Sequence, residues 1–73
     1  MNNSDLETNV QEFIYGCGIP LDGYYIEQTP FSEMLCYKNR HGRDFDLPIN
    51  DPDLAEAVIA KLKQLGVKIV KLN

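Results

Sequence analysis

The chain has 73 residues, 44% of them hydrophobic and 25% charged, so its composition argues against intrinsic disorder and predicts a single small globular domain over residues 1–73. Its net charge of −4 argues against a general nucleic-acid binder, because neutralising phosphate groups supplies most of the affinity of such proteins. Residues 1–37 contain six acids and no Lys or Arg, whereas residues 38–73 contain all seven bases. This asymmetry favours a role in recognition over one in catalysis.

The beginning of the chain is polar and acidic, without the basic segment and apolar stretch of a secretory signal. No uninterrupted apolar run exceeds four residues, so we expect no membrane-spanning segment and a cytoplasmic protein. In that reducing compartment, Cys17 and Cys36 are expected to be buried free thiols, not a disulfide or part of a zinc site.

A first helix is predicted over residues 5–17. Ser4 and Glu7 fit a capping box, in which each side chain accepts a hydrogen bond from the backbone amide of the other residue. Gly18 is suited to end the helix, and Pro20 prevents its continuation. One apolar stripe at helical spacing lies between these signals: Leu6, Val10, Phe13, Ile14 and Cys17.

Two strands joined by a short turn are predicted next. Residues 24–29 are rich in side chains that suit a pleated surface, and residues 33–38 follow closely enough to pair with them as a hairpin. A second turn over residues 39–42 comes after them, and its Gly42 is suited to a left-handed backbone conformation.

A third strand is predicted over residues 45–49. Apolar Phe45, Leu47 and Ile49 alternate with polar residues and Pro48, which is typical of a strand with one apolar face. Because Pro48 has no amide hydrogen to donate to a ladder, the strand is expected to lie at an edge or to end there.

A second helix is predicted between Asp51 and Gly66. Asp51 can cap it, Pro52 suits its first turn and Gly66 suits its end. Residues 67–72 then form a last strand whose apolar residues occur on both faces. That pattern predicts a strand that is central in the sheet or covered on both sides.

The predicted order is α-β-β-β-α-β, which indicates a two-layer α+β fold. The first three strands form an antiparallel meander, and a β-α-β crossover makes the last strand parallel to the third. The result is a mixed four-stranded sheet with the helices packed on it. The pattern leaves open whether the two helices cover the same face or opposite faces.

Catalytic residues are not grouped in any recognisable motif. His41 lies in a turn between Arg40 and Arg43, and it could act as a general base with Asp44 or Asp46, but a solvated turn histidine explains it better. Cys36 falls in the middle of a strand, where a buried thiol is unreactive. We therefore predict a protein that is not an enzyme.

Metal and cofactor sites are not predicted either. The sequence contains an acidic series of Asp44, Asp46, Asp51 and Asp53, but it lacks the glycine and closing glutamate of a calcium loop. A strand edge and a helix cap explain these four acids, so no metal, cofactor or small-molecule ligand is expected.

Surface recognition is the remaining interpretation. Tyr24 and Tyr25 must point to opposite sides of a strand. If Tyr24 faces the core with Ile26, Tyr25 points outward with Glu27, unless the first helix covers that face. The residues singled out for interaction are Tyr25, Glu27, Tyr37, Arg40, His41 and Arg43.

The favoured function is a small, non-enzymatic regulatory or protein-interaction module. It would act through the acidic, tyrosine-bearing surface or an open strand edge, on a protein partner or on a second copy of itself. The alternative is nucleic-acid binding through the basic turn that contains Lys38, Arg40 and Arg43.

Overall fold

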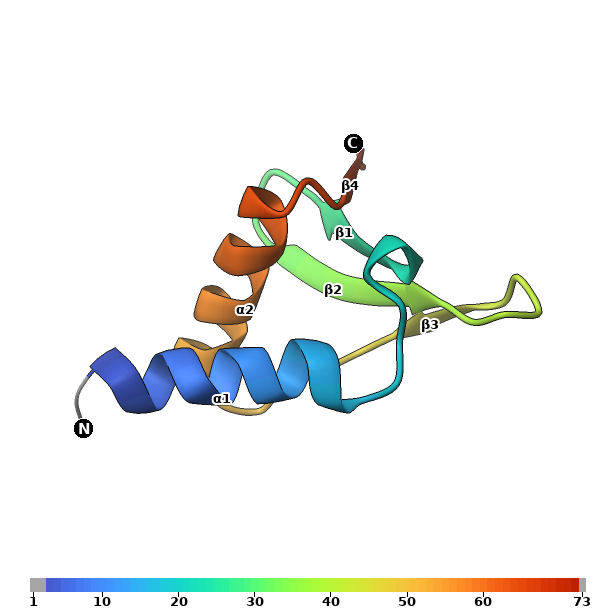
Figure 1. Cartoon of the computed structure of the whole chain (residues 1–73). Coiled ribbons are helices and arrows are strands. Elements are labelled where there is room, and N and C mark those ends of the chain that lie inside the picture. The colour runs from blue at the N-terminus through green and yellow to red at the C-terminus, as the bar shows by residue number, and fades with distance from the viewer. Residues whose placement is uncertain (1–2, 73) are drawn as a thin grey trace.

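A computed structural model describes the backbone of residues 3–72 and the side chains from residue 5 onward (Figure 1). It confirms the predicted α+β fold, with two helices and a mixed four-stranded sheet. The elements in chain order are α1 (Asn3–Gly16), the short 3-10 helix η1 (Leu21–Gly23), β1 (Tyr24–Gln28), β2 (Glu33–Lys38), β3 (Asp44–Asp46), α2 (Pro52–Gln64) and β4 (Lys68–Lys71).

The strands lie in the order β3-β2-β1-β4. β1, β2 and β3 form the predicted antiparallel meander, with Tyr24 opposite Tyr37 and Tyr37 opposite Phe45. β4 pairs in parallel with β1, so it runs in the same direction as β3 but at the opposite edge of the sheet.

The prediction that the last strand is central or covered on both sides is wrong. β4 is an edge strand, and Lys68, Ile69 and Lys71 are all exposed. β2 occupies one side of β1 and is itself bordered by β3, so the free side of β1 is where β4 joins the sheet. The two lysines of β4, Lys68 and Lys71, project from opposite faces of the strand, as suits a strand with an open edge.

β3 lies at the other edge, as Pro48 predicted, but the strand is shorter than the expected residues 45–49. After Asp46 one more backbone bond forms, from the Leu47 amide to the Leu35 carbonyl at 2.9 Å. Pro48 follows and has no amide hydrogen to continue the ladder.

The helix ends largely follow the predicted local signals. The Asp51 side chain caps α2 by accepting hydrogen bonds from the amides of Asp53 and Leu54 at 3.0 and 3.3 Å. At the other end, the Gly66 and Val67 amides donate to the Lys63 and Leu62 carbonyls, which is a complete Schellman motif.

The first helix differs slightly from the prediction of residues 5–17. α1 already includes Asn3 and ends at Gly16, and Gly18 adopts the expected left-handed conformation with a φ of 75°. The predicted capping box depends on the side chain of Ser4, which lies outside the described residues. Cys17 lies beyond the helix end and is exposed, which corrects the expectation that both cysteines are buried.

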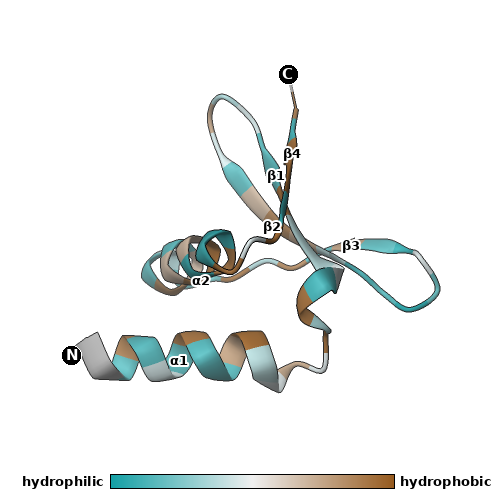
Figure 2. Cartoon of the chain, turned by 45° about the horizontal axis from the view of Figure 1, so that its top comes forward, coloured by the Kyte–Doolittle hydropathy of each residue, from teal (hydrophilic) through white to brown (hydrophobic). Residues whose placement is uncertain are grey.

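Both helices pack on the same face of the sheet, which settles the question left open by the sequence (Figure 2). Tyr24 links α1 to the sheet, because its hydroxyl donates to the Ile14 carbonyl at 2.9 Å near the end of α1 and lies 2.8 Å from the Cys17 Sγ. The buried cluster draws on α1, β1, β2 and α2: Val10, Ile14, Tyr24, Ile26, Leu35, Val58 and Leu62.

Candidate functional site

Among the residues that the structure describes, no helix lies on the opposite face of the sheet (Figure 2). Side chains alternate between the faces of a strand, so the neighbours of the core residues Tyr24, Ile26 and Leu35 point away from the helices. We call this surface the helix-free face. By strand register it is formed by Tyr25, Glu27, Met34, Cys36, Lys38, Asp44, Asp46, Lys68 and Val70.

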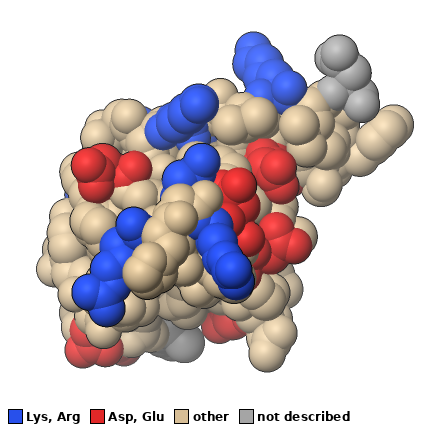
Figure 3. Space-filling model, turned by 90° about the vertical axis from the view of Figure 1, so that its right-hand side faces the viewer, with Lys and Arg blue, Asp and Glu red and all other residues tan. Residues whose placement is uncertain are grey.

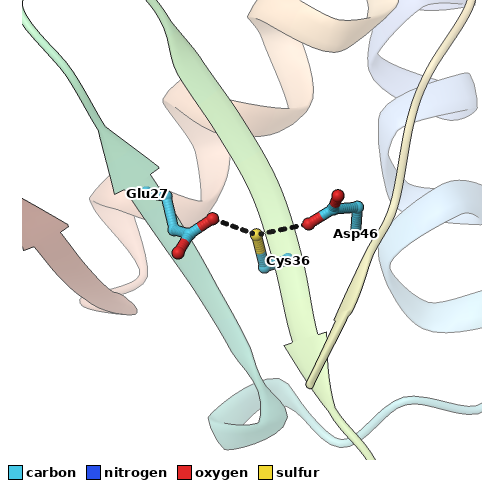
Figure 4. Close-up of side chains that lie close together, drawn as sticks. All are labelled: Glu27, Cys36 and Asp46. Carbon is cyan, nitrogen blue, oxygen red and sulfur yellow. Dashed lines mark hydrogen bonds between the residues drawn. The ribbon is translucent and has the colours of Figure 1, made fainter. Parts of the chain in front are cut away.

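Cys36 lies at the centre of the helix-free face and is only 1% exposed. Its Sγ lies 3.4 Å from Glu27 Oε1 on β1 and 3.6 Å from Asp46 Oδ1 on β3 (Figure 4). Burial raises the pKa of this thiol to about 12, and the two carboxylates add to the shift because they disfavour a thiolate. The thiol is therefore protonated and unreactive at neutral pH, as its mid-strand position predicted.

Tyr25 and Glu27 point to the helix-free face, as the alternation predicted. The Tyr25 side chain crosses β2, and its hydroxyl donates to Asp44 Oδ1 at 3.1 Å. Desolvation, reinforced by this hydrogen bond, raises the pKa of Tyr25 to about 12. The same carboxylate oxygen lies 3.6 Å from Lys38 Nζ, so Asp44 has both a neutral and a charged partner.

Glu27 and Asp46 lack such compensation. Within the described residues, ion pairs join Lys38 to Asp44 and Lys63 to Glu33, and neither Glu27 nor Asp46 pairs with a cation. Two carboxylates therefore face one buried thiol, and neither forms an ion pair with a described lysine or arginine.

Tyr37 does not join this face. It projects to the helix side, where its ring stacks on that of Phe45 with centroids 5.3 Å apart. There it lines an open groove of about 980 Å³, together with Lys38, Arg40 and the segment from Cys17 to Gly23. Three of the predicted interaction residues are thus divided between two surfaces, with Tyr25 and Glu27 on one and Tyr37 on the other.

His41 and Arg43 lie in the exposed turn between β2 and β3. The Asn39 side chain organises this turn by accepting hydrogen bonds from the backbone amides of both residues, each at 2.9 Å. Gly42 adopts the predicted left-handed conformation with a φ of 80°. This turn lies at the end of the molecule seen in Figure 3, where Lys and Arg side chains alternate with groups of Asp and Glu and form no continuous basic surface.

The proposed pairing of His41 with Asp44 or Asp46 has no counterpart among the described hydrogen bonds. Asp44 is engaged by Tyr25 and Lys38, and Asp46 by Cys36. The acidic series also separates, because Asp51 caps α2 whereas Asp44 and Asp46 belong to β3.

Sequence reasoning missed the convergence of Glu27, Cys36 and Asp46. The signal was present in the two hairpin turns, because their lengths set the register that places Cys36 opposite Asp46 and two residues along β2 from Met34, the partner of Glu27. Sequence reasoning instead grouped Asp46 with acids that are close to it in the chain, and so it did not connect Asp46 with Glu27.

Comparison with known proteins finds no match for this chain among family models, curated proteins or solved structures. None of the helices in the described residues is long and apolar enough to cross a membrane. The function must therefore be inferred from the surfaces of the protein itself.

Proposed function

We propose that this protein is a non-enzymatic interaction module that binds a protein partner through the helix-free face of its sheet. The observation that carries the proposal is the one-sided placement of α1 and α2 (Figure 2). A sheet face that no described helix of the chain covers is available to another molecule across the width of all four strands.

The chemistry of the helix-free face supports contact with a protein. Met34 is 43% exposed, and Tyr25 and Val70 are partly exposed beside it. Tyrosine and methionine are enriched in protein interfaces because they offer large adaptable contact areas. Three acids and two lysines belong to the face, so its net charge is −1 and favours a partner with a basic surface.

The open edge of β4 extends this surface. Ile69 and Leu72 are each 40% exposed at this edge, where one side of the strand has no neighbour. An extended segment of a partner can add to such an edge by backbone hydrogen bonding. Lys68 and Lys71 would favour an acidic segment in that position and disfavour indiscriminate strand pairing.

Nucleic-acid binding through the basic turn receives less support. Lys38 is paired with Asp44, which leaves Arg40 and Arg43 as the unpaired cations of the turn within the described residues. Retention on DNA or RNA that falls steeply with salt and disappears in an Arg40→Glu, Arg43→Glu variant would favour this alternative.

Site-specific photo-crosslinking tests the proposal. A photoreactive residue is placed at Met34 on the helix-free face, and a control carries it at Tyr15, which is 62% exposed on α1. Both proteins are irradiated alone and in extract of the native host, at near-physiological salt, and adducts are identified by mass spectrometry.

We expect a defined adduct from position 34 that position 15 does not give. An adduct of twice the chain mass would identify a second copy as the partner, and a different mass would identify another protein. The proposal is wrong if the two positions give the same adducts, or if position 34 gives none.

A further inference from the structure

Glu27, Cys36 and Asp46 project from three neighbouring strands and converge on one point of the helix-free face (Figure 4). One sulfur and two carboxylate oxygens all lie within 4.8 Å of one another. They combine a soft donor, the thiol, with two hard donors, and β1, β2 and β3 hold all three through their ladder hydrogen bonds.

The hydrogen bonding of this group is incomplete as it stands. A thiol has one proton, yet the Cys36 Sγ faces carboxylates at both 3.4 and 3.6 Å, and its remaining contact is the Met34 carbonyl at 3.7 Å. At any moment at least one carboxylate therefore faces sulfur without a proton between them. Because Cys36 is 1% exposed, water cannot surround the sulfur and relieve this contact.

A cation bound at this point would remove the conflict, and the two lysines of the helix-free face, Lys38 and Lys68, form no ion pair with either carboxylate. Neither Glu27 nor Asp46 has a lysine or arginine partner, although Asp44 on the same face does. The uncompensated charge is thus concentrated at the two carboxylates that point at the buried sulfur.

We infer that Glu27, Cys36 and Asp46 form a binding site for a divalent transition metal, with zinc as the ion that the donor set fits best. Tetrahedral zinc with bonds of about 2.3 Å to sulfur and about 2.1 Å to oxygen separates these donors by roughly 3.6 Å. The observed separations of 3.4 and 3.6 Å match that spacing.

Binding requires one proton to leave. The Sγ–H bond breaks, the Sγ–metal bond forms, and the proton passes to solvent. The 2+ charge of the ion is then held by one thiolate and two carboxylates. Asp46 is exposed and Glu27 is half-buried, so water can reach the carboxylate side of the site. Calcium and magnesium are disfavoured because they avoid sulfur ligands.

This inference is independent of the proposed protein partner, and it is tested on the untagged full chain. Cobalt(II) is titrated first, because a cobalt–thiolate bond gives an ultraviolet charge-transfer band and tetrahedral cobalt gives visible bands. Zinc is then used to displace cobalt, and its affinity is measured by competition with a chromophoric chelator. Calcium and magnesium serve as competing ions.

We expect one ion per chain, with a charge-transfer band that zinc abolishes and calcium leaves unchanged. Glu27→Gln and Asp46→Asn should each weaken zinc binding by more than roughly tenfold, and Cys36→Ser should remove the band. Cys17→Ser and Asp44→Asn are the matched controls and should bind as the parent chain does.

Three results would overturn the inference. The first is an absence of saturable cobalt or zinc binding by the parent chain. The second is a charge-transfer band that is lost in Cys17→Ser but kept in Cys36→Ser. The third is an affinity that the Glu27→Gln, Asp46→Asn double variant retains, and because these isosteric changes lie outside the core, circular dichroism can show that the variant is folded.

Discussion

The two faces of the sheet are built from alternate residues of the same strands but are stabilised differently. Leu35 and Cys36 are neighbours, and both are almost fully buried, at 3% and 1% exposure. Leu35 is buried by the helices within the apolar cluster, whereas Cys36 is buried on the helix-free face among polar side chains. One face is therefore closed by hydrophobic packing, and the other holds charges that a partner or an ion can neutralise.

The largest expected difference concerns thiol reactivity. Burial beside two carboxylates raises the pKa of Cys36 from 9.0 to about 12. The reactive thiolate fraction should therefore be roughly a thousandfold lower in the folded chain than in the unfolded chain. A thiol reagent at pH 8 should modify one cysteine of the native protein, Cys17, and both cysteines in denaturant.

Mass spectrometry of the labelled peptides checks this result. The raised pKa of Cys36 also makes the free energy of unfolding depend on pH, because the folded state retains a proton that the unfolded state loses. The contribution of the protonated thiol to stability is complete below pH 9 and is lost as the pH rises toward 12. Fast native labelling of Cys36 would show that the helix-free face does not protect it.

Truncation of the closed face should cost the most stability. Ile26→Ala removes a fully buried side chain beneath the helices and should lower the free energy of unfolding by about 2–5 kcal/mol. Val70→Ala on the helix-free face, where the side chain is only half-buried, should cost less than about 1 kcal/mol.

Urea denaturation of both variants measures the difference. If Ile26→Ala does not fold, Ile26→Val is the milder substitute and should cost about 0.5–1.5 kcal/mol. Equal losses for the Ile26 and Val70 variants would contradict the assignment of the two faces.

Two adjacent tyrosines offer a finer comparison. Tyr24→Phe removes the hydroxyl that donates to the Ile14 carbonyl in the core and should cost about 1 kcal/mol. Tyr25→Phe removes a hydroxyl bonded to the exposed Asp44, which water can replace, and should cost less than about 0.5 kcal/mol. The reverse order of these losses, measured by thermal unfolding, would contradict the structure.

The smallest expected effect concerns the ion pairs. Lys63 lowers the pKa of Glu33, so this pair stabilises the folded state above the ordinary carboxyl pKa of 4.5, and its contribution is lost as the pH falls. Lys63→Gln should cost about 0.5 kcal/mol or less at pH 7, because both side chains are partly exposed. The loss should shrink toward pH 3.

Lys38→Gln is the matched control for that measurement. Its partner Asp44 is more exposed than Glu33, and solvent screening should make the loss smaller still. A larger loss for Lys38→Gln would show that the ion pair of the helix-free face contributes more to stability than the pair beside α2.

The helices, hairpins and turns were predictable from the sequence because short-range physics determines them. The Asp51 cap, the Gly66 closure, the left-handed Gly42 and the outward direction of Tyr25 each depend on residues a few positions apart. The exposure of Cys17 was not predictable in this way, because it depends on a helix that ends one residue earlier than its pattern indicated.

Local signals in the amino-acid sequence thus determined the order of the elements and the two turns that align β1, β2 and β3. The tertiary structure alone decided that β4 joins the free side of β1, that both helices share one face, and that Glu27, Cys36 and Asp46 meet around one sulfur. The physical reason is that these choices depend on pairing between segments distant in sequence, where the same alternation pattern is compatible with more than one neighbour.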